Sequence, residues 1–377
     1  MTDVAATADD PRRALWLIGY IAPAVAPVLG LMTLAGLSAS IIAYLPLVLL
    51  FGVAPVVDHL IGRDHRNPET GAIAALEADP YYRRILHGTV IAYAVAVICA
   101  VWLSAYAGFS TREWWAFAIG AGFVHSLIVL VAHELGHSHD RSDNRTAWAA
   151  LALMSYGHFG VEHNLTHHVK VATPDDPASS RFGESIYAFA LREMPGVFRG
   201  AIRVEGDRLR RRGRGWWNAS NELLRSWATS LAFAALLGAA FGWGAVLFYA
   251  VHCLTLWFSI TMANYTAHYG LLRRMVNGRR EPCRAAHSWS SSFLFSNLLF
   301  LNLQRHADHH LNAQRPFQTL SHIEGSPQLP AGIPGLFCMM LIPPLWFRVM
   351  NRRLLDYVDG DESRINFGPV SDPGADR

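Results

Sequence analysis

The sequence predicts an all-α integral membrane protein with six transmembrane helices and a helical cap on their cytoplasmic side. Three observations predict this fold. Of the 377 residues, 52% are hydrophobic and only 16% are charged, whereas soluble domains contain about 25% charged residues. Long uncharged stretches alternate with short turns, and the basic residues collect in the segments on one side of them. These features exclude a soluble globular enzyme, a disordered protein and a secreted disulfide scaffold.

The six spans follow from the distribution of apolar residues. Residues 15–37 form a run of 23 residues without a charged side chain. Such a run is long enough to cross about 30 Å of hydrocarbon as a helix. It is too long for a cleavable signal peptide, and other spans follow it. The expected spans are residues 15–37, 41–58, 86–108, 114–133, 226–241 and 243–264.

The arginines predict the orientation of these spans. Short turns join the spans in pairs on one side of the membrane, and the long segments on the other side carry nearly all of the arginines. The positive-inside rule therefore places the long segments and both termini in the cytoplasm. Of the 32 basic residues, only Lys170 is not arginine, which is typical of a GC-rich bacterium. We therefore expect a multi-pass protein of the bacterial cytoplasmic (inner) membrane, without a nucleic-acid partner.

A single membrane domain accounts for the chain. The apolar stretch Gly332–Met350 is expected to be an interfacial helix, because Pro343 and Pro344 interrupt it and a crossing would carry Arg352 and Arg353 outside. The expected parts are an N-terminal tail (1–14), the spans with their cytoplasmic loops (15–264), a histidine-rich cytoplasmic region (265–360) and a flexible tail (361–377).

Three histidine clusters on the cytoplasmic side predict a metal centre. Histidines three or four residues apart lie on one face of a helix, which lets them share one ion. Imidazole suits Zn, Cu, Fe and Ni, and one structural zinc takes four ligands, so eight imidazoles indicate two ions. The clusters contain His133 and His137; His163, His167 and His168; and His306, His309 and His310.

Other residues near these clusters leave alternatives open. His133-Glu134-Leu-Gly-His137 also fits a zinc-protease helix with a general base, but that interpretation leaves the other clusters unexplained. Glu134, Glu162 and Asp308 are expected to accept ring N–H groups of the neighbouring histidines. His125 and His252 lie inside spans, and their roles stay open. Five further histidines are expected to be surface or core residues: His59, His65, His87, His158 and His322.

Four longer motifs surround the histidines: His133-Glu-Leu-Gly-His137, Glu162-His163-Asn-x-x-His167-His168, Leu303-Gln-Arg-His306-x-Asp-His309-His310 and Asn264-Tyr-Thr-Ala-His268-Tyr-Gly-Leu-Leu-Arg273. On these motifs the chain, from Leu15 to Gly360, resembles the AlkB-type integral-membrane alkane 1-monooxygenases, which belong to the histidine-box superfamily of membrane desaturases and hydroxylases. The stretch Val171–Ala178 and His287-Ser-Trp289 are also similar to this family.

This resemblance implies a di-iron centre in the helical cap with nine histidine ligands, adding His268 to the eight above, and no haem or flavin. It implies hydroxylation of medium- to long-chain n-alkanes to 1-alkanols with O₂ and electrons from rubredoxin and its NAD(P)H-dependent reductase. Ala267 departs from the glutamate usual in the family, and His139 is an extra histidine that we expect to face solvent. The alternatives are a hydroxylase or desaturase of fatty-acyl, terpene or alkyl-aromatic substrates, and a metal transporter or scaffold.

The second span is expected to set the chain length of the substrate. Substrate would enter from the bilayer, and a bulky side chain partway along the channel would stop it. Leu50 and Phe51 are the candidates, and a helical rise of 1.5 Å per residue puts Leu50 about 12 Å above Asp58. Leucine is small and flexible and would block such a channel poorly. At this helical rise, we therefore expect the enzyme to accept alkanes of about 8 to 16 carbons.

Overall fold

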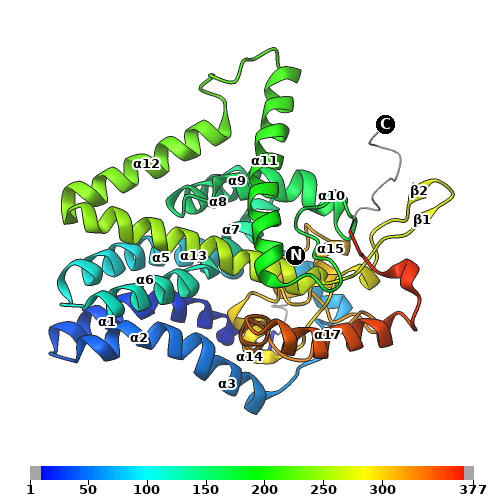
Figure 1. The fold of residues 1–377 in the computed structure, drawn as a ribbon, viewed down its shortest axis with the longest axis horizontal. Coiled ribbons are helices and arrows are strands. Elements are labelled where there is room, and N and C mark those ends of the chain that lie inside the picture. The colour runs from blue at the N-terminus through cyan, green and yellow to red at the C-terminus, as the bar shows by residue number, and fades with distance from the viewer. Residues whose placement is uncertain (1–9, 369–377) are drawn as a thin grey trace, which may run out of the picture.

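The computed structural model describes residues 10–368 and is almost entirely helical (Figure 1). Six segments are long and apolar enough to cross a membrane. Each overlaps one predicted span and differs from it by a few residues at its ends, so the number and order of candidate membrane helices agree with the prediction. The six segments are Arg13–Leu34, Ala39–Ile61, Pro80–Tyr106, Thr111–Gly136, Glu222–Phe241 and Trp243–His268.

Three of these segments are built from more than one helical element. Pro46 and Pro55, which cannot donate a backbone hydrogen bond, flank a π-helical stretch in the second segment. Ser126 interrupts the fourth segment. In order, the segments consist of η1 (Arg13–Tyr20) and α1 (Ile21–Leu34); α2 (Ala39–Leu47), η2 (Val48–Val53) and α3 (Ala54–Ile61); α5 (Pro80–Tyr106); α6 (Thr111–His125) and α7 (Leu127–Gly136); α12 (Glu222–Phe241); and α13 (Trp243–His268).

Local sequence signals fix the ends of these helices. Asp79 caps α5 by accepting a hydrogen bond from the backbone of Tyr81. Ser110 and Glu113 form a capping box at the start of α6, in which each side chain satisfies a free backbone N–H group. Gly242 turns the chain between α12 and α13 with a φ of +83°, a conformation that glycine adopts without a steric penalty.

Large apolar side chains are exposed along the span bundle. Leu34, Ile91 and Leu231 are each at least 68% exposed in the absence of lipid. A water-soluble protein rarely exposes extended apolar surfaces of this kind, and a bilayer would cover them.

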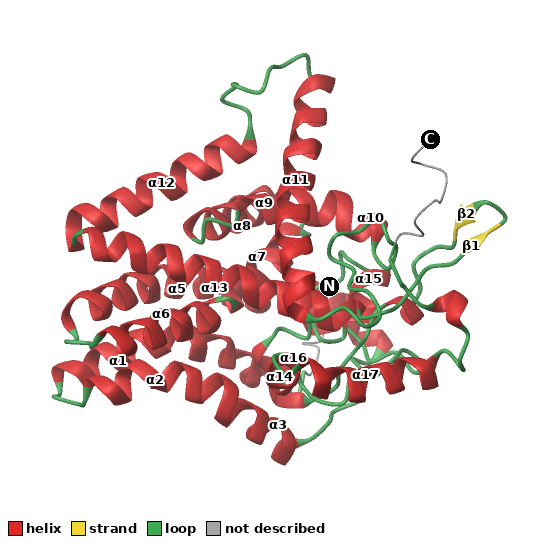
Figure 2. Ribbon diagram, in the orientation of Figure 1, coloured by secondary structure: helices red, strands yellow, loops and turns green. Residues whose placement is uncertain are grey.

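Most of the remaining elements form a helical cap at the end of the bundle where α7 and α13 terminate, whereas α8 and α9 fold back along the spans and pack against α7 and α12 (Figure 2). Within the described residues only β1 and β2 are strands, and an Asn277-Gly278 turn joins them with both residues at positive φ, as a tight hairpin requires. The other elements are η3 (Thr70–Ala72), α4 (Ile73–Ala78), α8 (Arg141–Leu153), α9 (Gly157–Glu162), η4 (His163–His167), α10 (His168–Lys170), α11 (Ile186–Arg211), β1 (Met275–Val276), β2 (Arg279–Arg280), η5 (Ala285–His287), α14 (Leu294–Leu299), α15 (His306–Leu311), η6 (Phe317–Thr319), α16 (Ile333–Met340), α17 (Pro343–Tyr357) and η7 (Glu362–Arg364).

The C-terminal part of the chain was expected to contain an interfacial helix followed by a flexible tail. The stretch Gly332–Met350 is divided between α16 and α17, and neither helix is among the candidate spans. Residues 361–368 were expected in a flexible tail, but Ile365 is buried and pairs with Leu271. The outer parts of both expected tails, residues 1–9 and 369–377, lie outside the described residues.

Candidate metal centre

The nine histidines predicted as ligands gather at the end of the span bundle. They form two groups, and within each group one nitrogen per ring lies within 4.8 Å of the others. We call them the first and the second histidine group. The first contains His133, His137, His163, His168 and His309, and the second contains His167, His268, His306 and His310.

Four separate segments deliver these rings. His133 lies in the last turn of α7, and His268 is the last residue of α13. The third cluster lies on the short helix α15, where His306 and His310 are four residues apart and share a group. Because helical residues at this spacing lie on one face, the third cluster contributes two rings to the second group and only His309 to the first.

The second cluster contributes rings to both groups from a single helical turn. Residues His163–His167 form the π-helical turn η4, in which backbone hydrogen bonds connect residues five apart rather than four. His163 and His168, which are five residues apart, therefore both reach the first group, and their Nε2 atoms are 3.1 Å apart. His167 lies between them in sequence and turns to the second group.

The distances between ring nitrogens fit metal ligands. Two nitrogens bound at right angles about 2.1 Å from one ion are about 3 Å apart. The Nε2 atoms of His133 and His309 are 2.9 Å apart, and those of His306 and His310 are 3.0 Å apart. The Nε2 atoms of His137 and His167 are buried without a hydrogen-bond partner among the described residues. The two groups therefore suit two metal ions, one in each.

Two of the rings, one in each group, are held by burial in the neutral form that binds metals. Burial lowers the pKa of His137 to about 4 and that of His306 to about 3, so both rings are neutral at pH 7, as ligation requires. Three rings of the second group direct Nδ1 to an oxygen, which leaves Nε2 for an ion. These contacts are His167 to Asp176 Oδ2 (2.9 Å), His268 to the His287 carbonyl (3.4 Å) and His306 to the Leu303 carbonyl (3.2 Å).

The structure gives the three carboxylates expected to support the histidines other surroundings. Glu134 accepts a hydrogen bond from the backbone N–H of Phe317. Asp308 binds Arg315 at 2.8 Å. Burial raises the pKa of Glu162 to about 8, and its Oε1 atom has no hydrogen-bond partner in the described part of the chain. Each of these residues is adjacent to a ligand histidine, and consecutive residues on a helix point about 100° apart, so their side chains face away from the rings.

Asp176 provides the carboxylate contact instead. Its Oδ2 atom lies 2.9 Å from His167 Nδ1 and accepts a second hydrogen bond from Ser179 Oγ at 2.6 Å. The backbone N–H of Ala178 donates to its other oxygen. These bonds hold the buried carboxylate in place, so that it can orient the His167 ring.

Histidines outside the predicted set belong to neither group. His139 is exposed, as expected. His65 contacts His322, and His87 contacts Asp143. The two histidines inside spans contact each other, with His125 Nδ1 2.8 Å from His252 Nε2.

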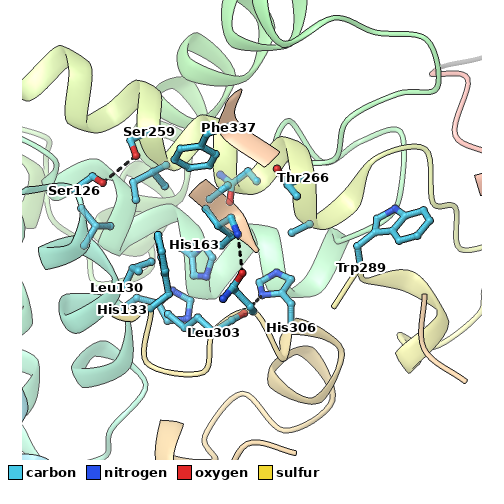
Figure 3. Close-up of a pocket in the computed structure, with 18 of the residues that line it drawn as sticks. Ser126, Leu130, His133, His163, Ser259, Thr266, Trp289, Leu303, His306 and Phe337 are labelled. Carbon is cyan, nitrogen blue, oxygen red and sulfur yellow. Dashed lines mark hydrogen bonds between the residues drawn. The ribbon is translucent and has the colours of Figure 1, made fainter. Parts of the chain in front are cut away.

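An apolar cavity adjoins the histidines (Figure 3). It runs between α7 and α13, whose facing residues line it together with Phe337 from α16. His133, His163 and His306 form part of its wall. A chain-like apolar ligand in this cavity would place one end beside both histidine groups.

The two side chains expected to line the channel are not part of this cavity wall. Leu50 and Phe51 lie in η2 and belong to the same apolar cluster as Phe337. The Phe51 ring packs edge-on against Phe123, with their centroids 5.0 Å apart. These residues therefore support the helix that carries Phe337 rather than contact the cavity directly.

Comparison with known proteins identifies the family to which the chain belongs. Residues 112–337 match the fatty acid desaturase family model. Alkane 1-monooxygenase 1 of Alcanivorax borkumensis is 40% identical over 363 residues, which cover 96% of this chain and 89% of that protein. Alkane 1-monooxygenase of Pseudomonas putida is 39% identical over 361 residues, which cover 94% and 89% of the two chains. The chain belongs to the alkane 1-monooxygenase family.

A weaker similarity reaches a different hydroxylase. The xylene/toluene monooxygenase hydroxylase component XylM of Pseudomonas putida is 30% identical over 222 residues, which cover 58% of each chain. The chain is thus similar both to the fatty acid desaturase family model and, over part of its length, to a protein named for xylene and toluene hydroxylation.

Two residues of this alkane 1-monooxygenase family member were missed as functional candidates. Asp176 contacts His167, and the buried Trp289 is part of the cavity wall. Both lie in stretches that resemble the family, Val171–Ala178 and His287-Ser-Trp289, and this resemblance was the only signal. Neither an aspartate in a loop nor a tryptophan in a turn has a spacing that indicates a metal site.

Proposed function

We propose that this protein is a membrane di-iron monooxygenase that hydroxylates the terminal carbon of medium- to long-chain n-alkanes. The reaction consumes the alkane, O₂, two electrons and two protons, and gives a 1-alkanol and water. One observation carries the proposal: nine imidazoles in two groups lie beside an apolar cavity between membrane helices. The relatives named alkane 1-monooxygenase support the choice of substrate.

Iron is the metal that best suits both the residues and the reaction. Neutral imidazoles bind iron among other first-row metals, and nine of them provide enough ligands for two ions with positions left open. Two iron ions held there would supply the activation of O₂ and the transfer of one oxygen atom to a C–H bond. We therefore propose two iron ions and neither haem nor flavin as the cofactors of this chain.

The side chains of this protein would hold the metal ions, orient the ligand rings and keep water from the substrate. The nine histidines would hold the two ions, and Asp176 fixes the tautomer and direction of the His167 ring. The walls of the cavity are mostly apolar, so they bind an alkyl chain and keep water from the reacting carbon. The substrate carbon has no acidic proton, so no general base is needed there.

We propose that the centre faces the cytoplasm of a bacterium. The histidine groups lie at the end of the bundle that carries the long, arginine-rich connections, and the positive-inside rule assigns that side to the cytoplasm. The same rule supports an inner-membrane protein with both termini in the cytoplasm.

Electrons must come from another protein. All four cysteines are free and none pairs in a C-x-x-C motif, so the chain offers no rubredoxin-type iron site of its own. We propose that rubredoxin, reduced by its NAD(P)H-dependent reductase, docks beside Trp289. Trp289 also borders a surface pocket whose other walls include Arg348, Arg352 and Arg353. These arginines would attract an acidic partner and orient it.

Trp289 links this pocket to the second histidine group. Its ring centroid lies 6.1 Å from that of Tyr357, which borders the pocket. Its backbone N–H donates to the carbonyl of Ala267, the residue before His268. An electron arriving at the pocket would thus have a short route of rings and hydrogen bonds to a ligand.

Charge reversal tests the docking site. The double variant Arg348→Glu/Arg352→Glu should raise the KM for rubredoxin at least tenfold and leave the KM for alkane unchanged. Arg211→Glu/Arg212→Glu is the matched control, because these arginines are also exposed and lie at the end of α11, well away from α17 (Figure 1). An effect of the control but not of the α17 variant would place the docking site elsewhere.

Substrate comparison tests the function itself. Purified protein with rubredoxin, reductase and NAD(P)H should convert octane or hexadecane to the 1-alkanol and should contain about two iron ions per chain. Preference for a fatty acid, terpene or alkyl-aromatic substrate would favour another branch of the superfamily. Protein without bound iron and without oxidation of any of these substrates would contradict an enzymatic role.

A further inference from the structure

Two serines close the membrane end of the apolar cavity. Ser126, between α6 and α7, and Ser259, on α13, face each other with their Oγ atoms 2.9 Å apart (Figure 3). The Ser126 hydroxyl donates to the carbonyl of Phe123 at 2.6 Å, so its lone pairs accept from Ser259. Both side chains are at most 5% exposed. Because both hydroxyls are bonded, the pair offers an apolar chain end no unpaired polar group, which would be costly to bury.

The helices touch directly beyond this serine pair. A Cβ atom added to Gly122 on α6 would lie 2.7 Å from the backbone carbonyl of His252 and 2.7 Å from the Thr255 side chain on α13. Real Cβ contacts are not this short, so only glycine permits the approach. His125 and His252 bind each other at the same level. The gap between α6–α7 and α13 therefore ends at Ser126 and Ser259.

The depth of the cavity follows from the helix geometry. Seven residues separate Ser126 from His133 along the chain, which corresponds to a rise of about 10 Å. An extended alkyl chain of about eight carbons is as long as this rise of seven helical residues. A straight alkane with one end beside the histidines would therefore reach the serines with its other end.

We propose that Ser126 and Ser259 form the stop that determines which alkane chain length this enzyme hydroxylates fastest. The inference rests on the proposed function and specifies its substrate as a chain whose far methyl group meets the serine pair. Longer alkanes fit only if α6–α7 and α13 separate or if the chain bends out of the cavity, so their rates decline with each added carbon.

A mixture of alkanes tests this stop. Wild-type protein, Ser126→Leu and Ser259→Leu are each given hexane to hexadecane in one vessel, and the 1-alkanols are separated by gas chromatography. The ratio of products is independent of the amount of folded enzyme. Each leucine should shift the preferred length downward by about two carbons and raise the ratio of hexanol to decanol about tenfold, the effect of roughly one misfit methylene in a fitted pocket.

A matched variant controls for a general effect of leucine on α13. Ala250 lies on the same helix but is exposed on the outer surface of the bundle. Ala250→Leu should leave the product ratio unchanged. If a leucine variant lacks iron and fails to fold, Ser126→Val and Ser259→Val repeat the test with smaller side chains, and their iron content shows that the centre is intact.

The outcomes separate this inference from the proposed function. If wild-type and serine variants hydroxylate alkanes with the same product ratios, the serine stop is wrong and the proposed function stands. If the wild-type protein oxidises no alkane, the proposed function is wrong and the inference falls with it. A shift in the serine variants but not in Ala250→Leu supports both.

Discussion

His167 Nδ1 lies 2.9 Å from Asp176 Oδ2, and both residues are only 1% exposed. Within residues 10–368, no ring of the first histidine group has a hydrogen bond to a carboxylate. The two groups therefore differ electrostatically, although both consist of imidazoles. The second group has a buried carboxylate behind one of its rings, which would strengthen that ring as a donor to a cation.

Asp176→Asn should weaken metal binding at the second group. Amide replaces carboxylate at nearly the same size, so the ring loses a charged acceptor without a large change in packing. We expect iron affinity to fall about 10- to 100-fold, as for other partners of metal-bound histidines. Iron retained during dialysis against a chelator measures the effect. Asp175→Asn is the control, because Asp175 is the exposed neighbour in the chain, and equal iron loss in both variants would contradict the role of Asp176.

Single histidine replacements should separate the two groups from the remaining histidines. His309→Ala in the first group and His268→Ala in the second should each lose at least half of the bound iron and nearly all alkane hydroxylation. His139→Ala should keep both, because His139 is exposed and lies in neither group. Elemental analysis and octanol formation provide the measurements. Full iron and activity in His268→Ala would make the set of nine ligands wrong.

Glu193→Gln should change how stability depends on pH. Glu193 is 1% exposed on α11 and accepts hydrogen bonds from Thr261 and Asn264. Burial raises its pKa to about 7 from an ordinary value of 4.5. Between these pH values the folded chain keeps a proton that the unfolded chain has lost, so this group makes stability fall as pH rises. Glutamine stays neutral and removes this contribution, which is at most about 3 kcal/mol.

Thermal unfolding in detergent at pH 5 and pH 8 measures this difference. The Tm of Glu193→Gln relative to wild type should increase from pH 5 to pH 8. Glu77→Gln serves as the control, since Glu77 is exposed and should show no such trend. A relative Tm that decreases toward pH 8 would mean that Glu193 is ionised in the folded protein.

Leu50→Trp should shorten the accepted alkanes through an indirect route. η2 packs against α16, where the backbone carbonyl of Phe51 lies 3.4 Å from the Cys338 sulfur. A larger side chain in this packed cluster must displace its neighbours and would press Phe337 into the cavity. Product profiles on mixed alkanes should therefore shift to shorter chains, and adding Phe337→Ala should reverse the shift. A shift that Phe337→Ala does not reverse would mean that the introduced indole ring acts without Phe337.

The six candidate spans and eight of the nine grouped histidines could be predicted from the sequence because both depend on local patterns. Hydropathy needs only consecutive residues, and paired histidines need only helical spacing. His268 has no such partner and was identified by family resemblance alone. The supporting carboxylates could not be found from adjacency, because a neighbour in sequence need not face the same ring, whereas Asp176 reaches His167 from a loop nine residues later.

The position of the cavity could not be predicted in the same way. It depends on where two helices separate and where they meet again. Gly122 permits the contact with α13, and the interruption at Ser126 lets α7 depart from it. These are properties of a pair of segments more than 120 residues apart in the chain, and hydropathy assigns both simply to the membrane.

The π-helical turn at His163–His167 has a consequence for how the centre is assembled. One turn supplies rings to both histidine groups, so the first ion to bind immobilises a segment that the second ion also needs. The second ion then loses less conformational freedom on binding. Apoprotein titrated with ferrous iron should accordingly fill cooperatively, passing from empty to doubly occupied with little of the mononuclear form.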